Sequence, residues 1–206
     1  MVAMDKHSIC TMALQRLGED ELVDNSPTYK ACGTWYKHVL SMACARYNWT
    51  FLARECELEA SGEGVRGAKV YRKPVGCLKL TYVCNSAGKR ITDWRLTMEG
   101  IVVAAECVPS GGKICVRYQT DLSAAEGGTP DDAPDFNEGV ICLLASEMCM
   151  HLRSDAQHAI QLKQEADMHF ARAITHDRQQ DWSNAIDPVT RIRRMNSNLA
   201  SMRCHW

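Results

Sequence analysis

The sequence lacks the features that mark several large classes of protein. Lysine and arginine number 24 against 25 for aspartate and glutamate, so no bulk positive field attracts nucleic acid. Apolar runs such as 101–105 are far shorter than the roughly 20 residues that a membrane-spanning helix needs. The amino terminus lacks the basic-then-apolar order of a secretory signal. We therefore expect a cytosolic protein with no membrane span and no dedicated DNA-binding domain.

The eleven cysteines include no CxxC pair. Their odd number and irregular spacing fit neither a disulfide framework nor a zinc site, which places its ligands in close pairs. Most have apolar neighbours in the sequence. We expect them to be small buried hydrophobic residues in a reducing cytosol. We also predict no metal and no cofactor.

Two functional alternatives come from particular residues. Cys142 and Cys149 lie near His151 and His158 in the sequence, which suggests a thiol nucleophile with an imidazole base. However, these thiols fall in the apolar stripe of a predicted helix, and no orienting acid or oxyanion loop is recognisable. We therefore predict that the chain is not an enzyme. A small cytosolic enzyme with a reactive cysteine remains an alternative, as does a nucleic-acid-associated module that stacks bases on aromatic side chains.

Helical periodicity predicts four helices, at 5–17, 26–47, 134–152 and 154–180. The second begins at Ser26 and Pro27, where a hydroxyl can cap free amides and proline needs no donor. Between 49 and 118, short β-branched and aromatic runs predict a small, mostly antiparallel sheet with strands at 50–58, 77–84, 93–96, 100–105 and 113–118. A turn at 110–112 should join the last two strands, and 121–133 should be a polar loop.

The predicted fold class is α+β, a helical bundle of about four helices with an inserted small antiparallel β-sheet and an extended C-terminal arm. The bundle comprises 1–48 and 134–182, the inserted β-rich domain and loop 49–133, and the arm 183–206. Four aromatic residues should form the core where helix meets sheet, and that core should be shared: Trp35, Tyr47, Trp49 and Phe51. The arm combines arginines with apolar residues that a partner's groove would bury: Arg191, Ile192, Arg193, Arg194, Leu199 and Trp206.

Several short phrases, in this order, are similar to those of a known family. They are Ala13-Leu14-Gln15-Arg16-Leu17-Gly18, Ala45-Arg46-Tyr47-Asn48-Trp49-Thr50-Phe51-Leu52-Ala53-Arg54, Tyr71-Arg72-Lys73-Pro74 before Cys77-Leu78, Trp94 ahead of Glu99-Gly100, Tyr118, and Pro134 and Phe136 before Leu144-Ala145. Together they cover roughly residues 5 to 180. In their order and spacing the chain resembles the tail tubular protein A and head-to-tail connector (adaptor) family of short-tailed bacteriophages.

That resemblance implies a structural protein of the virion, assembled in the host cytoplasm. It implies a homo-oligomeric ring, usually of twelve copies, that lies under the portal protein and continues the DNA channel. DNA would pass through this channel without sequence-specific binding, and the ring would offer a platform for a downstream tail or nozzle protein. From its position and charge we expect the arm at 183–206 to reach into portal clefts.

Overall fold

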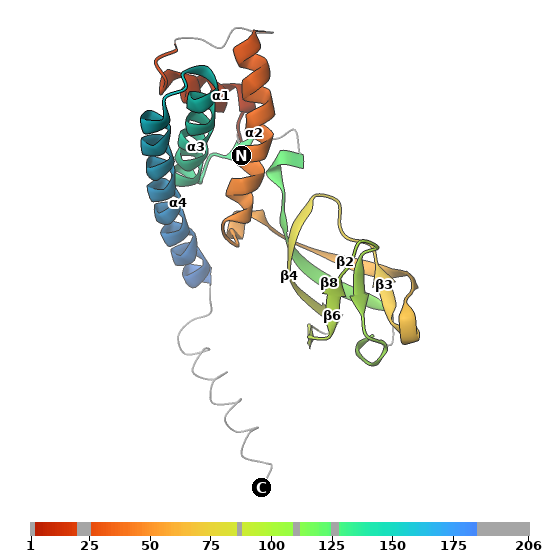
Figure 1. Cartoon of the computed structure of the whole chain (residues 1–206). Coiled ribbons are helices and arrows are strands. Elements are labelled where there is room, and N and C mark those ends of the chain that lie inside the picture. Colours follow the sequence, from red (N-terminus) through yellow and green to blue (C-terminus); the bar gives the residue numbers. More distant parts are fainter. Residues whose placement is uncertain (1–2, 20–25, 86–87, 109–111, 125–127, 185–206) are drawn as a thin grey trace.

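A computed structural model describes residues 3–19, 26–85, 88–108, 112–124 and 128–184. Four helices form one body: α1 (Lys6–Gln15), α2 (Pro27–Ala45), α3 (Pro134–Leu152) and α4 (Ala156–Asn184). A β-sheet body is inserted in the chain between α2 and α3 (Figure 1). All four predicted helices are therefore present, with slightly different ends.

Side-chain oxygens set where three of the helices begin. Asp5 accepts a hydrogen bond from the Ser8 amide, and Ser26 accepts one from the Tyr29 amide at 3.0 Å. At α4 the capping residue is Asp155, whose Oδ1 accepts from the His158 amide at 3.0 Å. The chain can turn so tightly from α3 into α4 because Ser154 adopts a left-handed conformation, with φ at 53°.

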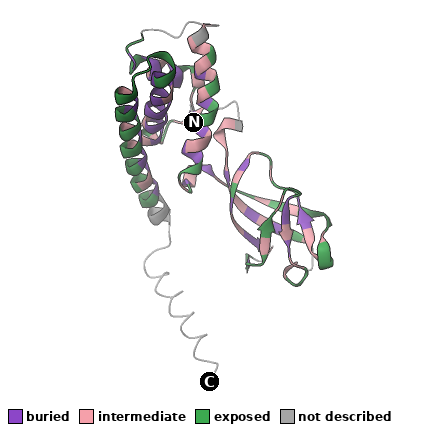
Figure 2. Ribbon diagram, in the orientation of Figure 1, coloured by how far each residue is buried: buried purple, intermediate pink, exposed green. Residues whose placement is uncertain are grey.

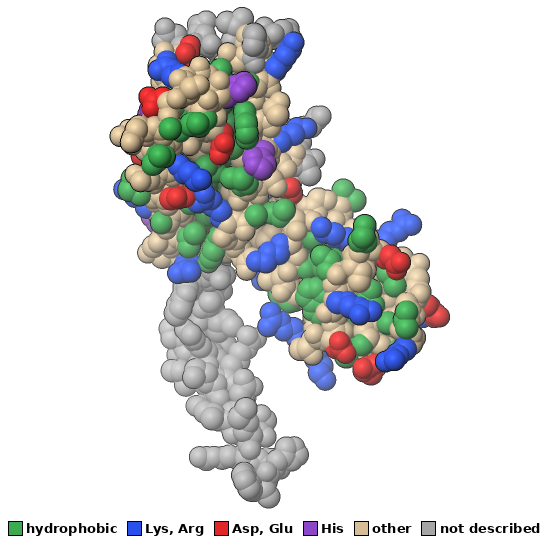
Figure 3. All heavy atoms as spheres, in the orientation of Figure 1, with side chains coloured by type: hydrophobic (Ala, Val, Ile, Leu, Met, Phe, Trp, Pro, Cys, Tyr) green, Lys and Arg blue, Asp and Glu red, His purple; other side chains and the backbone are tan. Residues whose placement is uncertain are grey.

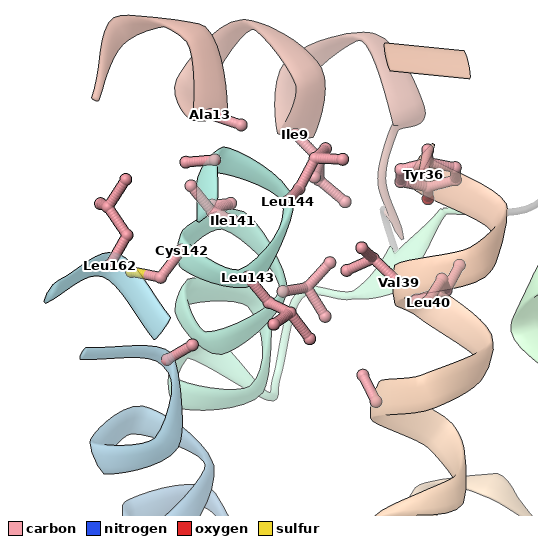
Figure 4. Close-up of a cluster of buried hydrophobic side chains, with 14 of the residues drawn as sticks. Ile9, Ala13, Tyr36, Val39, Leu40, Ile141, Cys142, Leu143, Leu144 and Leu162 are labelled. Carbon is pink, nitrogen blue, oxygen red and sulfur yellow. The ribbon is translucent and has the colours of Figure 1, made fainter. Parts of the chain in front are cut away.

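The helical body encloses its own apolar core, in which α3 is the central helix. Most of α3 is buried, whereas much of α4 faces solvent (Figure 2). Figure 4 shows Leu143 and Leu144 of α3 reaching toward α2 and α1, and Cys142 pointing toward Leu162 of α4. Since every one of these side chains is at most 4% exposed, α3 holds the other three helices together through hydrophobic contact.

The inserted sheet has seven strands in the order β5-β4-β8-β2-β3-β7-β6, and neighbouring strands pair antiparallel. The strands are β2 (Ala53–Glu63), β3 (Lys69–Tyr71), β4 (Cys77–Asn85), β5 (Arg90–Ile91), β6 (Trp94–Leu96), β7 (Ile101–Val103) and β8 (Lys113–Thr120). The long strand β2 pairs with β8 through its first half and with β3 through its second, across a register shift at Ala60/Gly62. This irregularity bends β2 and curls the sheet into a nearly closed, barrel-like form.

The interior of this sheet is a second apolar core, separate from that of the helices. It contains nine buried residues from five of the strands: Tyr71, Cys77, Leu80, Val83, Ile91, Ile101, Val103, Ile114 and Val116. Glutamates on the outer face of β2 pair with basic residues directly opposite on β8, as Glu59 does with Lys113 at 2.9 Å. Alternation along β2 therefore separates a charged outside from an apolar inside.

The predicted fold class is wrong about the size and the independence of the β-sheet. The sheet is not a small insertion on a helical bundle but a seven-stranded body with its own core. The prediction that sheet and helices share one core is also wrong, because the two buried clusters are distinct. The predicted hairpin at 110–112 is also wrong: β8 pairs with β2 and β4, while β7 pairs with β3 and β6.

Two further differences concern the cysteines and the loop at 121–133. Cys10 of α1 and Cys32 of α2 form a disulfide, so the expectation of free thiols fails for this pair. The expected loop contains a short strand, β9 (Thr129–Pro130), that pairs with β1 (Ala3–Met4). Gly128 makes this pairing possible, because a Cβ at that position would lie 1.7 Å from the Met4 carbonyl oxygen.

None of the helices in the described part of the chain combines the length and the apolar character needed to cross a membrane.

Candidate functional site

A cluster of aromatic rings lies where the chain leaves α2 for the sheet. Trp49 is fully buried, and its ring meets those of Tyr47, Phe51 and Phe136 at centroid distances of 5.3, 5.5 and 5.1 Å. The contacts with Tyr47 and Phe136 are edge-to-face, the arrangement that the ring quadrupole favours. The cluster therefore joins the start of α3 to the segment after α2.

Hydrogen bonds hold this segment in place. The Trp49 indole Nε1 donates to the Ala43 carbonyl at 3.0 Å, which satisfies its one donor inside the core. Thr50 donates to Asp177 of α4 through its amide, at 3.0 Å to Oδ1, and through its hydroxyl, at 2.6 Å. Asp177 is only 5% exposed, so these bonds compensate a carboxylate that is largely removed from water.

A pocket of about 490 Å³ opens beside the aromatic cluster. Its lining comes from the segment after α2, the start of α3 and the end of α4, and comprises Trp49, Phe51, Asp132, Ala133, Pro134, Asp135, Phe136, Ala173, His176, Asp177 and Gln179. Aromatic and alanine side chains form its apolar part, whereas three aspartates carry negative charge. Such a junction pocket suits a basic side chain with an apolar stem.

One of these aspartates lies between two imidazoles of α4. The Asp135 carboxylate lies 3.0 Å from Nδ1 of His176 and 3.6 Å from Nδ1 of His169. His169 and His176 thus share one helix face, as their spacing of seven indicated, and both face α3 at this point. The sequence missed the partner, since nothing in the spacing of residues assigns Asp135 to them.

The predicted junction residues are only partly brought together. Tyr47, Trp49 and Phe51 lie in one cluster with Phe136, which sequence reasoning did not assign to it. Trp35 lies earlier on α2, where its ring contacts His38 at 6.1 Å. The predicted arm residues, Arg191, Ile192, Arg193, Arg194, Leu199 and Trp206, lie outside the described residues.

Neither thiol considered as a nucleophile donates a hydrogen bond to a histidine among the hydrogen bonds of the described residues. Burial raises the pKa of both the Cys142 and the Cys149 thiol above the ordinary value, which disfavours the thiolate at neutral pH. Cys149 donates to the Asp155 carbonyl at 3.5 Å rather than to a histidine. That the chain is not an enzyme remains a prediction.

Within the described ranges, one group of side chains has the spacing of metal ligands, namely Glu138, Cys142 and His169, where α3 packs against α4. The eight described cysteines outside the disulfide, of which Cys142 is one, are distributed over both the helical body and the sheet body.

Several large apolar side chains are exposed on both bodies. On α3 and α4 they are Met150, Leu152, Ile160 and Met168, and on the sheet body they are Val65, Val75, Leu96 and Met98. On the face seen in Figure 3, apolar side chains gather over the sheet body between basic ones. Exposed apolar side chains of this kind can be buried in contacts between proteins.

No family model and no curated protein matches this chain.

Proposed function

We propose that the chain is a head-to-tail adaptor subunit of a short-tailed phage virion. Copies of it form a ring, of twelve in the family that it resembles, beneath the portal protein. The ring continues the DNA channel and provides the attachment platform for the next tail or nozzle component. The proposal rests on the resemblance given above and on the architecture of two bodies in one chain.

The supporting observation is that two separately cored bodies are built into each subunit, with exposed apolar side chains on both. A ring needs two different surfaces on every copy, because each subunit contacts one neighbour with one surface and the other neighbour with the second. Met168 of α4 is 55% exposed and Met98 of the sheet body is fully exposed. Burying such side chains between neighbours stabilises a ring by about 25 cal/mol for each square ångström removed from water.

Attachment to the portal is assigned to the arm at 183–206. Arg191, Arg193 and Arg194 supply directional hydrogen bonds, while Ile192, Leu199 and Trp206 fill apolar notches. Exposed ion pairs contribute only about 0–1 kcal/mol each, so the arm needs apolar burial and repetition around the ring. The formal net charge of -1 is consistent with DNA that passes through the channel without being read.

The test mixes the purified chain with portal rings of the phage that encodes it and images the products by electron microscopy. We expect a ring of this chain under each portal. Truncation after Asn184, which keeps α4 whole, should leave a folded protein that no longer co-purifies with portal. Undiminished portal binding by the truncated chain would show that the two folded bodies carry attachment.

Ring closure is tested separately with a charge on the exposed face of α4. Met168→Glu should keep a folded monomer but prevent ring formation, because the carboxylate cannot be buried unpaired between neighbours. Gln161→Glu, which adds the same charge at another exposed position of α4, is the matched control and should still assemble. A wild-type chain that forms no ring on portal at all would overturn the adaptor proposal.

A further inference from the structure

Three side chains of different chemistry converge at the seam between α3 and α4. Glu138 and Cys142 lie four residues apart on α3 and so share a helix face, and His169 reaches them from α4. One ligand atom from each, a carboxylate oxygen, a thiol sulfur and an imidazole nitrogen, lies within 4.8 Å of the other two. Figure 4 shows Cys142 directed from α3 toward α4.

The two helices approach closely at this level. A Cβ added at Gly139 would lie 2.8 Å from the ring of Phe170, the residue that follows His169. Helix backbones that pack so tightly fix the positions from which their side chains extend. The convergence of the three side chains is therefore set by rigid elements and not by a loop.

His169 provides a second, independent observation. Its Nδ1 atom is shielded from solvent and makes no hydrogen bond among the described residues. The nearest acid, Oδ1 of Asp135, lies 3.6 Å away, slightly beyond hydrogen-bonding distance. Histidines that bind metals characteristically turn one ring nitrogen to the metal and donate the other N–H to a carboxylate. Asp135 is in the position of that carboxylate.

We propose that Glu138, Cys142 and His169 form a binding site for a single Zn²⁺ ion. Sulfur, nitrogen and oxygen ligands are all ones that zinc accepts, and three protein ligands leave a fourth position for water. Tetrahedral coordination brings a sulfur and a nitrogen ligand about 3.5 Å apart. The observed separations, up to 4.8 Å, close to that value by side-chain rotation while the helices remain in place.

The charges around the cluster favour a divalent cation. Arg16 forms ion pairs with Oε2 of Glu138 at 2.5 Å and with Glu165 at 3.4 Å. Its contact with Glu138 uses one carboxylate oxygen and leaves the other for the metal. Two carboxylates, those of Glu138 and Glu165, thus share one guanidinium, and Asp135 lies beside His169, so a divalent cation would offset the remaining negative charge.

Among the cysteines that the structure describes, Cys142 is the one that lies together with a histidine and a carboxylate in such a group. Cys84 and Cys115, directly opposite on β4 and β8, are the obvious competing thiols for a soft metal. The proposal does not depend on the adaptor function, because it concerns contacts within one subunit.

The experiment titrates the chelator-treated, full-length protein with Co²⁺ as a spectroscopic substitute for Zn²⁺. A thiolate bound to Co²⁺ produces a charge-transfer absorption, and Zn²⁺ should abolish it by displacement at one equivalent. Cys142→Ser should remove the band, and His169→Gln should weaken binding at least about a hundredfold. Asp135→Asn should weaken it about tenfold, because that residue only orients the imidazole.

Cys115→Ser is the matched control and should leave both the band and the stoichiometry unchanged. Because Cys142 is buried, its variant could fail to fold, so circular dichroism accompanies each titration and the partly exposed His169 provides the second variant. Added Zn²⁺ should raise the melting temperature of the wild-type protein but not that of His169→Gln. Absence of a band in the wild type, or a band that persists in folded Cys142→Ser, would overturn the proposal.

Discussion

At the scale of single residues, Trp49 makes contacts at the junction that a smaller side chain could not make. The structure buries it completely among three other rings and gives its indole nitrogen a carbonyl partner. Tryptophan removed from such a site leaves a cavity as well as lost apolar contact.

We predict that Trp49→Ala lowers the free energy of unfolding by about 3–5 kcal/mol. Trp49→Phe should cost less, since most of the apolar contact remains and one hydrogen bond is lost, worth about 1 kcal/mol. Trp35→Ala is the control. Its ring is half-buried and, like Trp49, precedes the inserted sheet in the sequence, so its loss should have the smaller effect. Urea denaturation measures all three, and an unchanged midpoint for Trp49→Ala would contradict the role of this residue at the junction.

The sequence identified Trp49 because it follows a helix and precedes a β-rich stretch. It did not identify Phe136 or Asp177, which are 87 and 128 residues further along the chain than Trp49. Nothing local distinguishes Phe136 from any other apolar residue at the start of a helix. Its place beside Trp49 depends on how α3 packs against the segment after α2, which is a property of the tertiary fold.

At the scale of the elements, the α3–α4 contact shows why local propensity can mislead. Glycine inside a helix costs about 1 kcal/mol relative to alanine, so propensity alone marks Gly139 as a weak point. In the structure Gly139 lies against Phe170, which is 2% exposed and cannot move aside. The missing side chain is what allows α4 to approach.

We therefore predict that Gly139→Ala destabilises the protein, because overpacking costs about 1–3 kcal/mol and exceeds the gain in helix propensity. Gly33→Ala on α2 is the matched control. Its new Cβ would meet only the flexible end of Lys6, at 3.2 Å, so stability should be equal or slightly higher. Thermal unfolding of the two variants gives the comparison, and a stabilised Gly139→Ala protein would mean that the helices separate at no cost.

The sequence also underestimated the sheet, for reasons that lie in short elements. Strands β3 and β5 contain three and two residues, too few for alternation to be recognised. Their residues Tyr71 and Ile91 complete the interior only when the chain curls around on itself. Likewise, the spacing of Glu138 and Cys142 was readable, but their meeting with His169 depends on the register that the turn at Ser154 imposes.

At the scale of the whole molecule, a buried tyrosine hydroxyl and a buried cysteine thiol make the stability of the protein fall at alkaline pH. Burial raises the pKa of Tyr36 from 10.0 to about 12 and that of Cys44 from 9.0 to about 11. Above pH 9 the unfolded chain loses these protons while the folded chain keeps them. Because the folded state then binds more protons, stability must fall as the pH rises from about 9 to 12.

We predict a melting temperature that declines over this alkaline range, with a shallower decline in Tyr36→Phe. The substitution should cost little at neutral pH, since the Tyr36 hydroxyl is buried without a hydrogen-bond partner among the described residues. Differential scanning calorimetry at a series of pH values provides the measurement. If wild type and variant declined in parallel, ionisation of Tyr36 would not contribute.

The two chain crossings between the bodies give the protein a mechanical property. The chain enters the sheet at Ala53 and leaves it at Thr120, and these ends are adjacent, because Ala53 lies opposite Gln119 on neighbouring antiparallel strands. Tension that draws the sheet away from the helices therefore runs along β2 and β8 together, in covalent bonds, and does not pull the two strands apart. Rotation of the sheet body about these two connecting segments, in contrast, strains the hydrogen bonds between β2 and β8. The sheet body should therefore resist extension better than rotation.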